Sequence, residues 1–396
     1  MKVLQLCPKP LIPPFDGGKI AMVDMAEGLI GEGCELVQLM IHTPAHPLKS
    51  ETLKDKPNRF FTVFVNTKIR LIPALWNLLI GNSYNLSRFN DKAYHKKLEE
   101  LLLADQFDII QGESIYTLTD IERIRGNSKS KIILRAHNVE YKIWQRLSKT
   151  DANFLKRFYF KILAKQLKKK EIAICNQVDG LVVMSEQDKE ILQADGVIKP
   201  IKVIGIGSHI EPPEEHWDQV SEKKIFHLGS MNWLPNVEGV KWFIDNVWPL
   251  VQFKMPEIRL FLAGYEIEKV FPDGPKDNVK IVQAVDAREF MLQSGIMIVP
   301  LLSGSGIRVK IIEGLSLGKV IVTTNVGVEG ISAEDGKEIL IADNPKEFAD
   351  KILVCFSNPS FAEEISKNAL KFAKINFDYT LFSRQLIDFY HKMLLS

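Results

Sequence analysis

The sequence has few cysteines and no long hydrophobic run. The four cysteines, at Cys7, Cys34, Cys175 and Cys355, stand far apart and form no Cys-x-x-Cys pair. This spacing argues against a disulfide framework and predicts reduced, buried thiols, as in a cytoplasmic protein. No stretch reaches the ~18 consecutive apolar residues that a membrane-spanning helix needs. The N-terminal apolar run is cut short by Pro8, so we do not expect a signal peptide there.

The sequence also lacks an excess of charge and the usual signatures of a metal site. The formal net charge is +2, which gives no overall indication of a nucleic-acid partner. No two aspartates stand two residues apart, and the eight histidines do not pair at the spacing of metal ligands on a helix. We therefore expect no bound metal and no nucleic-acid partner.

What the sequence does contain is enough apolar material for two domains of ordinary size in its 396 residues. Short apolar runs alternate with stretches of helical spacing in both halves, which predicts parallel sheets covered on both faces by helices. The expected strands cover residues 2–7, 35–41, 107–111, 131–135 and 180–184 in the first half, and 224–228, 259–262, 279–282, 296–299 and 319–323 in the second.

Glycines and prolines between residues 204 and 214 predict a linker between the two halves. The expected domains are residues 1–205 and 206–379. The fold class is thus α/β, with two Rossmann-like β/α/β domains facing a cleft. Ligands of such sheets bind beyond the carboxyl ends of the strands, so the loops that follow strands are the candidate sites.

Two loops of the first half carry candidate residues. Gly17 and Gly18 precede a predicted helix, where backbone N–H groups favour an anion, although a plain glycine turn would look the same. His137, with Asn138 beside it, follows a strand and can donate or accept a hydrogen bond near neutral pH, or only cap a turn. Glu113 follows another strand and is either a site residue or merely solvated.

The most informative loop of the second half is residues 303–315. Its glycines, Gly304 and Gly306, can expose N–H groups to a phosphate, and Arg308 and Lys310 can neutralise it. Glu313 follows one helical turn after Lys310 among apolar neighbours, where a carboxylate needs a partner, and it can accept two ribose hydroxyls. A helix start with solvated charges is the alternative interpretation.

These loops carry a resemblance to a known family. The sequence from Gly304 to Gly318, and on through Gly327-Val328-Glu329-Gly330-Ile331, resembles the donor-binding signature of the retaining glycosyltransferases of family 4, the glycosyl transferases group 1, which have the GT-B fold. The loop from Gly229 to Asn236, the His137-Asn138 pair and the N-terminal glycine loop are similar as well. The resemblance covers nearly the whole chain, in order.

The resemblance implies roles for these residues. Glu313 would bind the ribose hydroxyls, Gly17 and Gly18 the diphosphate, and His137 the donor sugar. The base would lie near Gln283. Gly229, Ser230, Gly304, Ser305, Gly306 and Ile307 would complete the donor site, and Glu113 and Asn138 would belong to the acceptor side. The first domain would bind the acceptor, the second the nucleotide sugar, and a C-terminal helix, residues 380–396, would return to the first domain.

The sequence departs from the family pattern at two places. The family often has two glutamates in an E-x7-E pattern, and Ser305 replaces the first of them. Many members also carry an arginine and a lysine in the loop after Leu228, and the segment from Ser230 to Asn236 has neither. Arg308 and Lys310 are then expected to supply the positive charge on the leaving diphosphate, without metal or cofactor.

A basic stretch remains outside this pattern. Residues 154–170 contain seven lysines and arginines, no acidic residue and interleaved aromatic and aliphatic residues. This pattern is typical of a helix that lies on an anionic membrane surface, and equally of a helix packed on its own domain.

Together these features predict a metal-independent, retaining glycosyltransferase at the cytoplasmic membrane face. It would transfer a sugar from a nucleotide diphosphate donor to a lipid-linked or polysaccharide acceptor in envelope or exopolysaccharide synthesis. The alternatives are a sugar-nucleotide 2-epimerase of the same fold and a non-catalytic nucleotide-sugar-binding protein.

Overall fold

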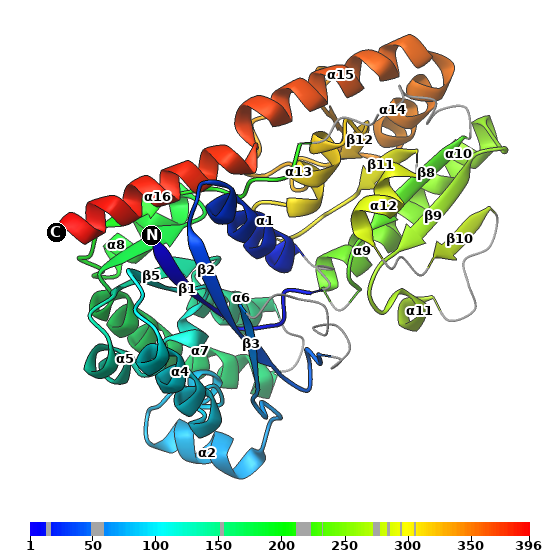
Figure 1. Ribbon diagram of the computed structural model, residues 1–396. Coiled ribbons are helices and arrows are strands. Elements are labelled where there is room, and N and C mark those ends of the chain that lie inside the picture. Colours follow the sequence, from blue (N-terminus) through cyan, green and yellow to red (C-terminus); the bar gives the residue numbers. More distant parts are fainter. Residues whose placement is uncertain are drawn as a thin grey trace. The chain divides into compact units, whose positions relative to one another are not determined.

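The structure is a computed structural model that describes the chain except residues 13–16, 49–58, 151–153, 211–222, 232, 272–277, 283–285, 294 and 305. It divides into two compact units (Figure 1). Unit 1 comprises Met1–Pro13, Met25–Gly205 and Phe382–Ser396, and unit 2 comprises Pro14–Asp24 and Ile206–Leu381. The chain thus passes from unit 1 to unit 2 between Gly205 and Ile206, within the stretch expected to be a linker, whose last residues lie outside the described ones.

Unit 1 is built on a seven-stranded parallel sheet with the order β3-β2-β1-β4-β5-β6-β7. Its strands are β1 (Lys2–Cys7), β2 (Glu35–His42), β3 (Phe60–Phe64), β4 (Ile109–Gly112), β5 (Lys131–Ala136), β6 (Gly180–Val183) and β7 (Ile201–Val203). Central strands buried on both faces need nearly continuous apolar runs, and β1, β4, β5 and β6 have them.

The helices of unit 1 join consecutive strands or cover the sheet. They are α1 (Gly17–Gly31, which begins in unit 2), α2 (Leu71–Leu79), α3 (Tyr84–Ser87), α4 (Lys92–Ala104), the 3₁₀ turn η2 (Ile115–Thr117), α5 (Ile121–Asn127), α6 (Glu140–Thr150), α7 (Phe154–Gln177), α8 (Glu186–Ala194) and α16 (Tyr379–Leu395, which also begins in unit 2). Several start where a side chain satisfies the free N–H groups of the first turn; Asp91 accepts hydrogen bonds from Ala93 N and Tyr94 N.

Unit 2 has a six-stranded parallel sheet with the order β10-β9-β8-β11-β12-β13. The strands are β8 (Lys224–Leu228), β9 (Arg259–Ala263), β10 (Val279–Val282), β11 (Ile296–Val299), β12 (Ile321–Thr323) and β13 (Leu340–Ile341). The helices are α9 (Leu234–Trp242), the π-helical turn η3 (Phe243–Val247), α10 (Trp248–Lys254), α11 (Ile267–Val270), α12 (Ala287–Leu292), α13 (Val309–Ser316), α14 (Pro345–Ser357) and α15 (Pro359–Asn376).

Both units therefore have a Rossmann-like parallel α/β architecture, as the sequence predicts. No strand is predicted from the sequence at the positions of β3, β7 and β13, and all three lie at sheet edges. An edge strand pairs on one side only and can be short, so its apolar signal is weak; β13 has two residues.

The π-helical turn explains one altered helix boundary. The sequence predicts a helix over residues 237–247 from its helical spacing of apolar residues, but the N–H of Trp248 donates to the carbonyl of Phe243, five residues back. Pro249 follows at the start of α10. A proline lacks the N–H and its ring clashes with the carbonyl four residues earlier, which is relieved by one wider turn.

The C-terminal helix α16 returns to unit 1, as expected. Gly180 of β6 lies under it, because a Cβ at Gly180 would be 2.8 Å from Phe389 Cζ and 3.0 Å from Met393 Sδ. Arg384 forms a 2.7 Å ion pair with Glu32 at the end of α1. None of the described helices is long and apolar enough to cross a lipid bilayer.

Candidate functional site

In unit 1, a buried carboxylate lies at the centre of a hydrogen-bonded cluster. Glu113, directly after β4, is 1% exposed. Its Oε2 accepts from Arg135 Nη1 at 3.0 Å and from His137 Nε2 at 2.7 Å. Its Oε1 accepts from Gln5 Nε2 and Gln111 Nε2, both at 2.5 Å. Burial raises the pKa of this carboxyl, but Arg135, His137 and Gln5 together hold the pKa at about 2. Glu113 is therefore ionised at neutral pH, and the structure brings it together with His137.

The charge on Glu113 fixes the proton position on His137. An ionised carboxylate only accepts hydrogen bonds, so His137 Nε2 carries the proton that it shares with Glu113. Burial and the nearby Arg135 lower the pKa of His137, against the opposing effect of Glu113. The neutral ring then holds a lone pair at Nδ1. His137 is thus an oriented imidazole, with 17% of its side chain exposed.

The network extends along a row of polar residues across the sheet. The register pairs Gln5 with Gln38 on one side and with Gln111 on the other, so these side chains share one face. Gln38 Nε2 donates to Gln5 Oε1 at 2.5 Å, and the hydroxyl of Tyr390 in α16 donates to Gln111 Oε1. This row of glutamines was not among the residues predicted from the sequence. Its signal is a polar residue at the centre of an otherwise apolar strand, which is costly unless hydrogen-bonded.

A second buried carboxylate fixes the loop after His137. Glu171 of α7 is 1% exposed and accepts hydrogen bonds from Glu140 N and Tyr141 N, both at 2.9 Å, at the start of α6. It thereby caps α6 from another helix. Burial, opposed by these two N–H groups, raises the pKa of Glu171 to about 8. Asn138 lies in the same loop but is exposed, and no hydrogen bond is described between its side chain and the Glu113 cluster.

In unit 2, three side chains converge over Gly229, directly after β8. A Cβ at this position would be 2.7 Å from Lys310 Nζ, 2.8 Å from Asn236 Nδ2 and 2.8 Å from His227 Nε2. Lys310 Nζ donates to Asn236 Oδ1 at 2.9 Å, and Asn236 Nδ2 donates to the carbonyl of Ser230 at 2.8 Å. We call Gly229, His227, Asn236 and Lys310 the Gly229 cradle. Glycine is required there because any side chain would fill it.

The cradle holds positive charge in a low-dielectric setting. Burial, together with the positive charge of Arg308, lowers the pKa of Lys310 to about 7. His227 is fully buried and its pKa lies well below the usual value, first because of burial and then because of Lys310. His227 Nδ1 lies 3.0 Å from the carbonyl of Ile298, so Nδ1 carries the proton and Nε2 faces the cradle as a lone pair. An anion placed here would restore the full charge of Lys310.

The backbone also contributes close approaches at this point. Gly229 N donates to the carbonyl of Ala263 at 2.9 Å, and Gly264 has a φ of 144°. A Cβ at Gly264 would lie 1.9 Å from the carbonyl oxygen of Gly229. The loops after β8 and β9 therefore come this close because position 264 is a glycine.

Arg308 is placed differently from Lys310. Its side chain is 4% exposed and stacks on Trp233, with its Cζ 5.4 Å from the ring centroid. Nη1 donates to the carbonyl of Gly306, and Nη2 lies 4.0 Å from a carboxylate oxygen of Glu329. Arg308 thus stabilises the loop before α13 as well as adding positive charge beside Lys310.

The other predicted residues of this loop surround Arg308. Gly304 has a φ of 117° and Gly306 a φ of 84°, conformations that favour glycine. A Cβ at Gly304 would lie 3.1 Å from Arg308 Nη2, and Ile307 packs against Gly330. Ser305 and Gln283 lie outside the described residues.

Glu313 lies on α13, half-buried between fully buried apolar neighbours. Burial, followed by the negative charge of Asp24, raises its pKa to about 8. Gly17 opens α1 close to the same helix, because a Cβ at Gly17 would be 2.9 Å from Val309 Cβ; Gly18 follows it. Glu313 is therefore a largely protonated carboxyl near neutral pH, able to donate as well as accept a hydrogen bond.

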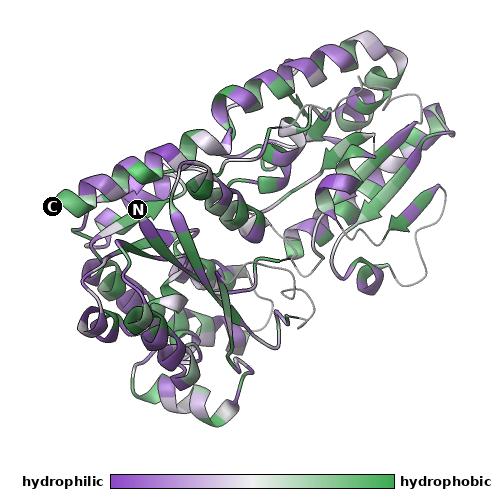
Figure 2. Ribbon diagram, in the orientation of Figure 1, coloured by the Kyte–Doolittle hydropathy of each residue, from purple (hydrophilic) through white to green (hydrophobic). Residues whose placement is uncertain are grey.

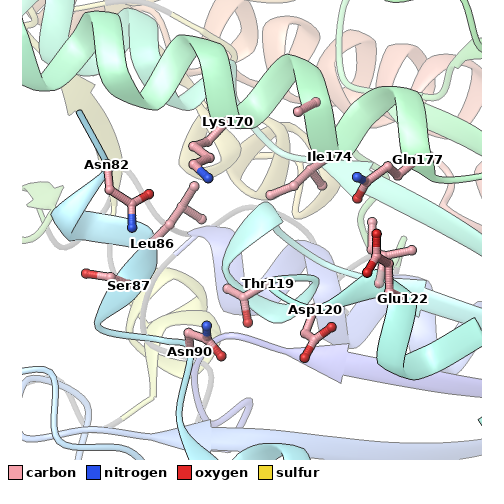
Figure 3. A pocket seen from close by; sticks show the side chains of 12 residues that line it. Asn82, Leu86, Ser87, Asn90, Thr119, Asp120, Glu122, Lys170, Ile174 and Gln177 are labelled. Carbon is pink, nitrogen blue, oxygen red and sulfur yellow. The ribbon is translucent and has the colours of Figure 1, made fainter. Parts of the chain in front are cut away.

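A pocket of about 310 Å³ in unit 1 involves none of the predicted donor-site or acceptor-site residues, although Lys170 of the predicted basic segment lines it (Figure 3). Figure 3 shows Asn82, Ser87, Asn90 and Thr119 around it, with Lys170 of α7 on the opposite side. Within the described part of the chain, no group of three or more His, Cys, Asp or Glu residues could hold a metal ion.

The part of unit 2 that carries these residues is similar to a known protein family. Residues 222–358 match the glycosyl transferases group 1. The Gly229 cradle, Arg308 and Glu313 all lie inside this group 1 domain. The chain is also 25% identical over 297 residues to an uncharacterized 44.6 kDa protein in the cps region of Klebsiella pneumoniae, an alignment that covers 71% of this chain and 74% of that protein.

Two solved structures share the fold over nearly the whole chain. HepE of Anabaena in complex with UDP-glucose matches with a TM-score of 0.68 and 14% identity, over 99% of this chain and 100% of that one. A sucrose-phosphate synthase of Thermosynechococcus elongatus matches with a TM-score of 0.68 and 16% identity, over 100% of both chains. The two Rossmann-like units are thus those of the GT-B fold, and the residues that match the glycosyl transferases group 1 lie within unit 2.

Proposed function

We propose that this protein is a glycosyltransferase that moves a sugar from a nucleotide diphosphate donor to a lipid-linked or polysaccharide acceptor. The observation that carries the proposal is the Gly229 cradle inside the group 1 domain. Among the described residues, no carboxylate lies within hydrogen-bonding distance of Lys310, which donates to the amide of Asn236. The pKa of Lys310 is lowered to about 7. A phosphate group suits such a site, because its negative charge would pair with the protonated form of Lys310 that burial disfavours.

The cations would act on the leaving diphosphate. Negative charge grows on the diphosphate as its bond to the sugar breaks, so Lys310 and Arg308 would stabilise the transition state more than the bound donor. Glu313 would hold the ribose hydroxyls, and Gly17, Gly18, Gly229, Ser230, Gly304, Gly306 and Ile307 would allow the backbone to approach the donor. Ser305 and Gln283 complete this proposed donor set.

We assign the sugar contact to His137. The buried Glu113 orients its ring, and the lone pair at Nδ1 can accept a hydrogen bond from a sugar hydroxyl. Glu113 would act through His137 and not on the substrate, and the exposed Asn138 would face the acceptor side. Retention of the anomeric configuration, and independence of metal and cofactor, complete the proposed reaction.

The donor is proposed to be a uridine diphosphate sugar, since HepE, which shares the fold, binds UDP-glucose. The biological setting is proposed to be surface polysaccharide synthesis at the cytoplasmic membrane face, since the relative from Klebsiella pneumoniae lies in a cps region. The basic segment 154–170 would hold the enzyme at an anionic membrane surface.

Binding of the donor is tested by thermal unfolding with UDP, UDP-glucose and other nucleotide sugars. A ligand at a hundred times its dissociation constant stabilises the fold by ~2.7 kcal/mol. Gly229→Ala should abolish this shift, because the added Cβ fills the cradle. Gly126→Ala is the matched control, since a Cβ there meets nothing within 4 Å. Equal shifts in both variants would place the nucleotide elsewhere.

Two other functions give different results in a turnover assay. A 2-epimerase would convert the nucleotide sugar with no acceptor present. A non-catalytic binding protein would bind the donor but release no nucleoside diphosphate with any acceptor. Ser305 stands where the family often has its first glutamate, and this departure favours the non-catalytic binding protein among the two alternatives. Release of nucleoside diphosphate that depends on a lipid-linked acceptor distinguishes the glycosyltransferase from both.

A further inference from the structure

The helix α2 of unit 1 exposes an apolar face that the predicted basic segment does not include. Ile72 is 83% exposed, Trp76 62% and Leu79 80%, and Ile69 and Ile80 on either side are 73% and 55% exposed. The spacing of four and three residues puts Ile72, Trp76 and Leu79 on one side of the helix. Figure 2 shows α2 hydrophobic over most of its length. An exposed apolar patch of this kind marks an interaction surface.

The charge around this face selects its partner. No aspartate or glutamate occurs between residues 59 and 90, a stretch that contains Arg59, Lys68, Arg70 and Arg88. Lys68 and Arg70 are exposed just before α2. With a formal net charge of only +2 for the whole chain, this positive charge is local and not a property of the overall composition.

The basic helix α7 lies against the other end of α2. Gln166 Nε2 donates to the carbonyl of Leu78 at 3.2 Å. Lys169 and Lys170 are exposed and lie three and four residues after Gln166, so they flank the C-terminal end of α2. Lys165, directly before Gln166, is exposed as well. Lys168 is different, because it is paired with Asp195 and packs over Tyr141 within the unit.

We infer that α2 is the element that enters a membrane, inserting Ile72, Trp76 and Leu79 among the acyl chains of an anionic lipid surface. The exposed cations of α7 and those before α2 hold the lipid headgroups. A tryptophan in such a face suits the boundary between headgroups and hydrocarbon. This inference rests on the proposed membrane-facing function, but it names α2, and not the basic helix alone, as the anchor.

Co-sedimentation of the full chain with vesicles of phosphatidylcholine and phosphatidylglycerol tests the inference. We expect Ile72→Ser with Trp76→Ser to lower the partition coefficient at least tenfold, at low and at high salt, because the lost interaction is apolar. Lys165→Gln with Lys169→Gln and Lys170→Gln should weaken binding mainly at low salt and mainly on anionic vesicles. Phe253→Ser is the control, since Phe253 of unit 2 is 84% exposed and lies outside both helices.

Quenching of Trp76 by brominated lipids supplies a second measurement. Vesicles should quench the wild-type fluorescence, and Trp76→Phe should lose most of that quenching while still sedimenting. Loss of binding in the lysine variant with no effect of the α2 substitutions would overturn the inference. So would a dimer in vesicle-free buffer that Ile72→Ser and Trp76→Ser convert to a monomer. The thermal shift with UDP is measured without vesicles, so a failure there would affect only the proposed function.

Discussion

The two units hold buried charge in opposite ways. In unit 1 the carboxylate of Glu113 is surrounded by four donors from Gln5, Gln111, Arg135 and His137, and its pKa is about 2. In unit 2 the ammonium of Lys310 has one amide acceptor, Asn236, and its pKa is lowered to about 7. A charge that the protein has fully satisfied stabilises the fold and orients its neighbours. A charge that the protein has left partly satisfied is ready for a ligand of opposite sign.

The number of partners around a buried charge also explains why the two glutamates of the proposed site differ in protonation. Glu113 stays ionised because Arg135 offsets its burial, whereas Arg288 offsets the burial of Glu313 only in part and the pKa of Glu313 rises to about 8. The same residue type thus acts as a fixed acceptor in one unit and as an exchangeable hydrogen-bonding group in the other.

Removing the satisfied charge should have the largest effect. Glu113→Ala leaves the guanidinium of Arg135, 0% exposed, without its carboxylate. We expect the free energy of unfolding to fall by ~3–5 kcal/mol, the cost of breaking a buried ion pair from one side. Urea unfolding of the variant measures it. Glu100→Ala, which removes an exposed i,i+3 pair with Lys97, is the control and should cost ~0.5 kcal/mol or less. Equal losses in both variants would contradict the comparison.

Removing the partly satisfied charge of Lys310 should lower diphosphate binding and turnover, and not the free energy of unfolding. Lys310→Ala is expected to leave the free energy of unfolding unchanged or higher, because a costly buried charge is gone. Turnover should fall by ~10²-fold, the scale of losing one preorganised donor to a developing charge. Single-turnover rates with the donor found in the thermal screen measure it. Arg308→Ala should lower turnover to a similar degree but also destabilise the loop, since Arg308 holds the carbonyl of Gly306. An unchanged rate in both variants would place the diphosphate elsewhere.

The carboxyl of Glu313 should affect binding more than rate, because ribose does not change during the reaction. Glu313→Gln is expected to cost ~1–3 kcal/mol in donor affinity, as for a buried hydrogen bond left incomplete. Titration of the donor by calorimetry measures this loss. If the variant binds normally but turns over slowly, Glu313 has a role in the chemical step and not in ribose recognition.

The pH dependence of diphosphate binding gives the smallest effect and the sharpest contrast. The pKa of Lys310 is about 7 in the free protein, and a bound diphosphate should raise it towards 10.5. Affinity for UDP should therefore be highest where the lysine is already charged, and should fall by up to ~10-fold per pH unit above pH 7. Lys310→Arg, which stays charged, should remove the dependence. A slope unchanged in that variant would assign the titration to another group.

The two lowered pKa values contribute to stability with opposite sign at neutral pH, favourably for Glu113 and unfavourably for Lys310, and both contributions rise with pH in their own windows. The lowered pKa of Glu113 contributes stability that is present above pH 4.5 and lost as pH falls towards 2. The lowered pKa of Lys310 makes the folded state bind fewer protons than the unfolded chain between pH 7 and 10.5, so its contribution to stability rises with pH across that window.

The sequence by itself determined the α/β class, most central strands and the loops that carry Glu113, His137, Arg308, Lys310 and Glu313. Apolar runs, helical spacing and glycine positions are local properties, so they can be recognised without coordinates. The predicted helix over residues 154–170 is likewise present as the first part of α7.

Only the tertiary structure decided which of these residues meet. Gln5, Gln38, Gln111 and Tyr390 are separated by up to several hundred residues, and the strand register and α16 bring them around Glu113. Lys310 reaches Gly229 only because α13 follows β11, the neighbour of β8 in the sheet. Burial, and with it the lowered pKa values of Glu113 and Lys310, depends on what packs around a side chain, and no local pattern of residues encodes that.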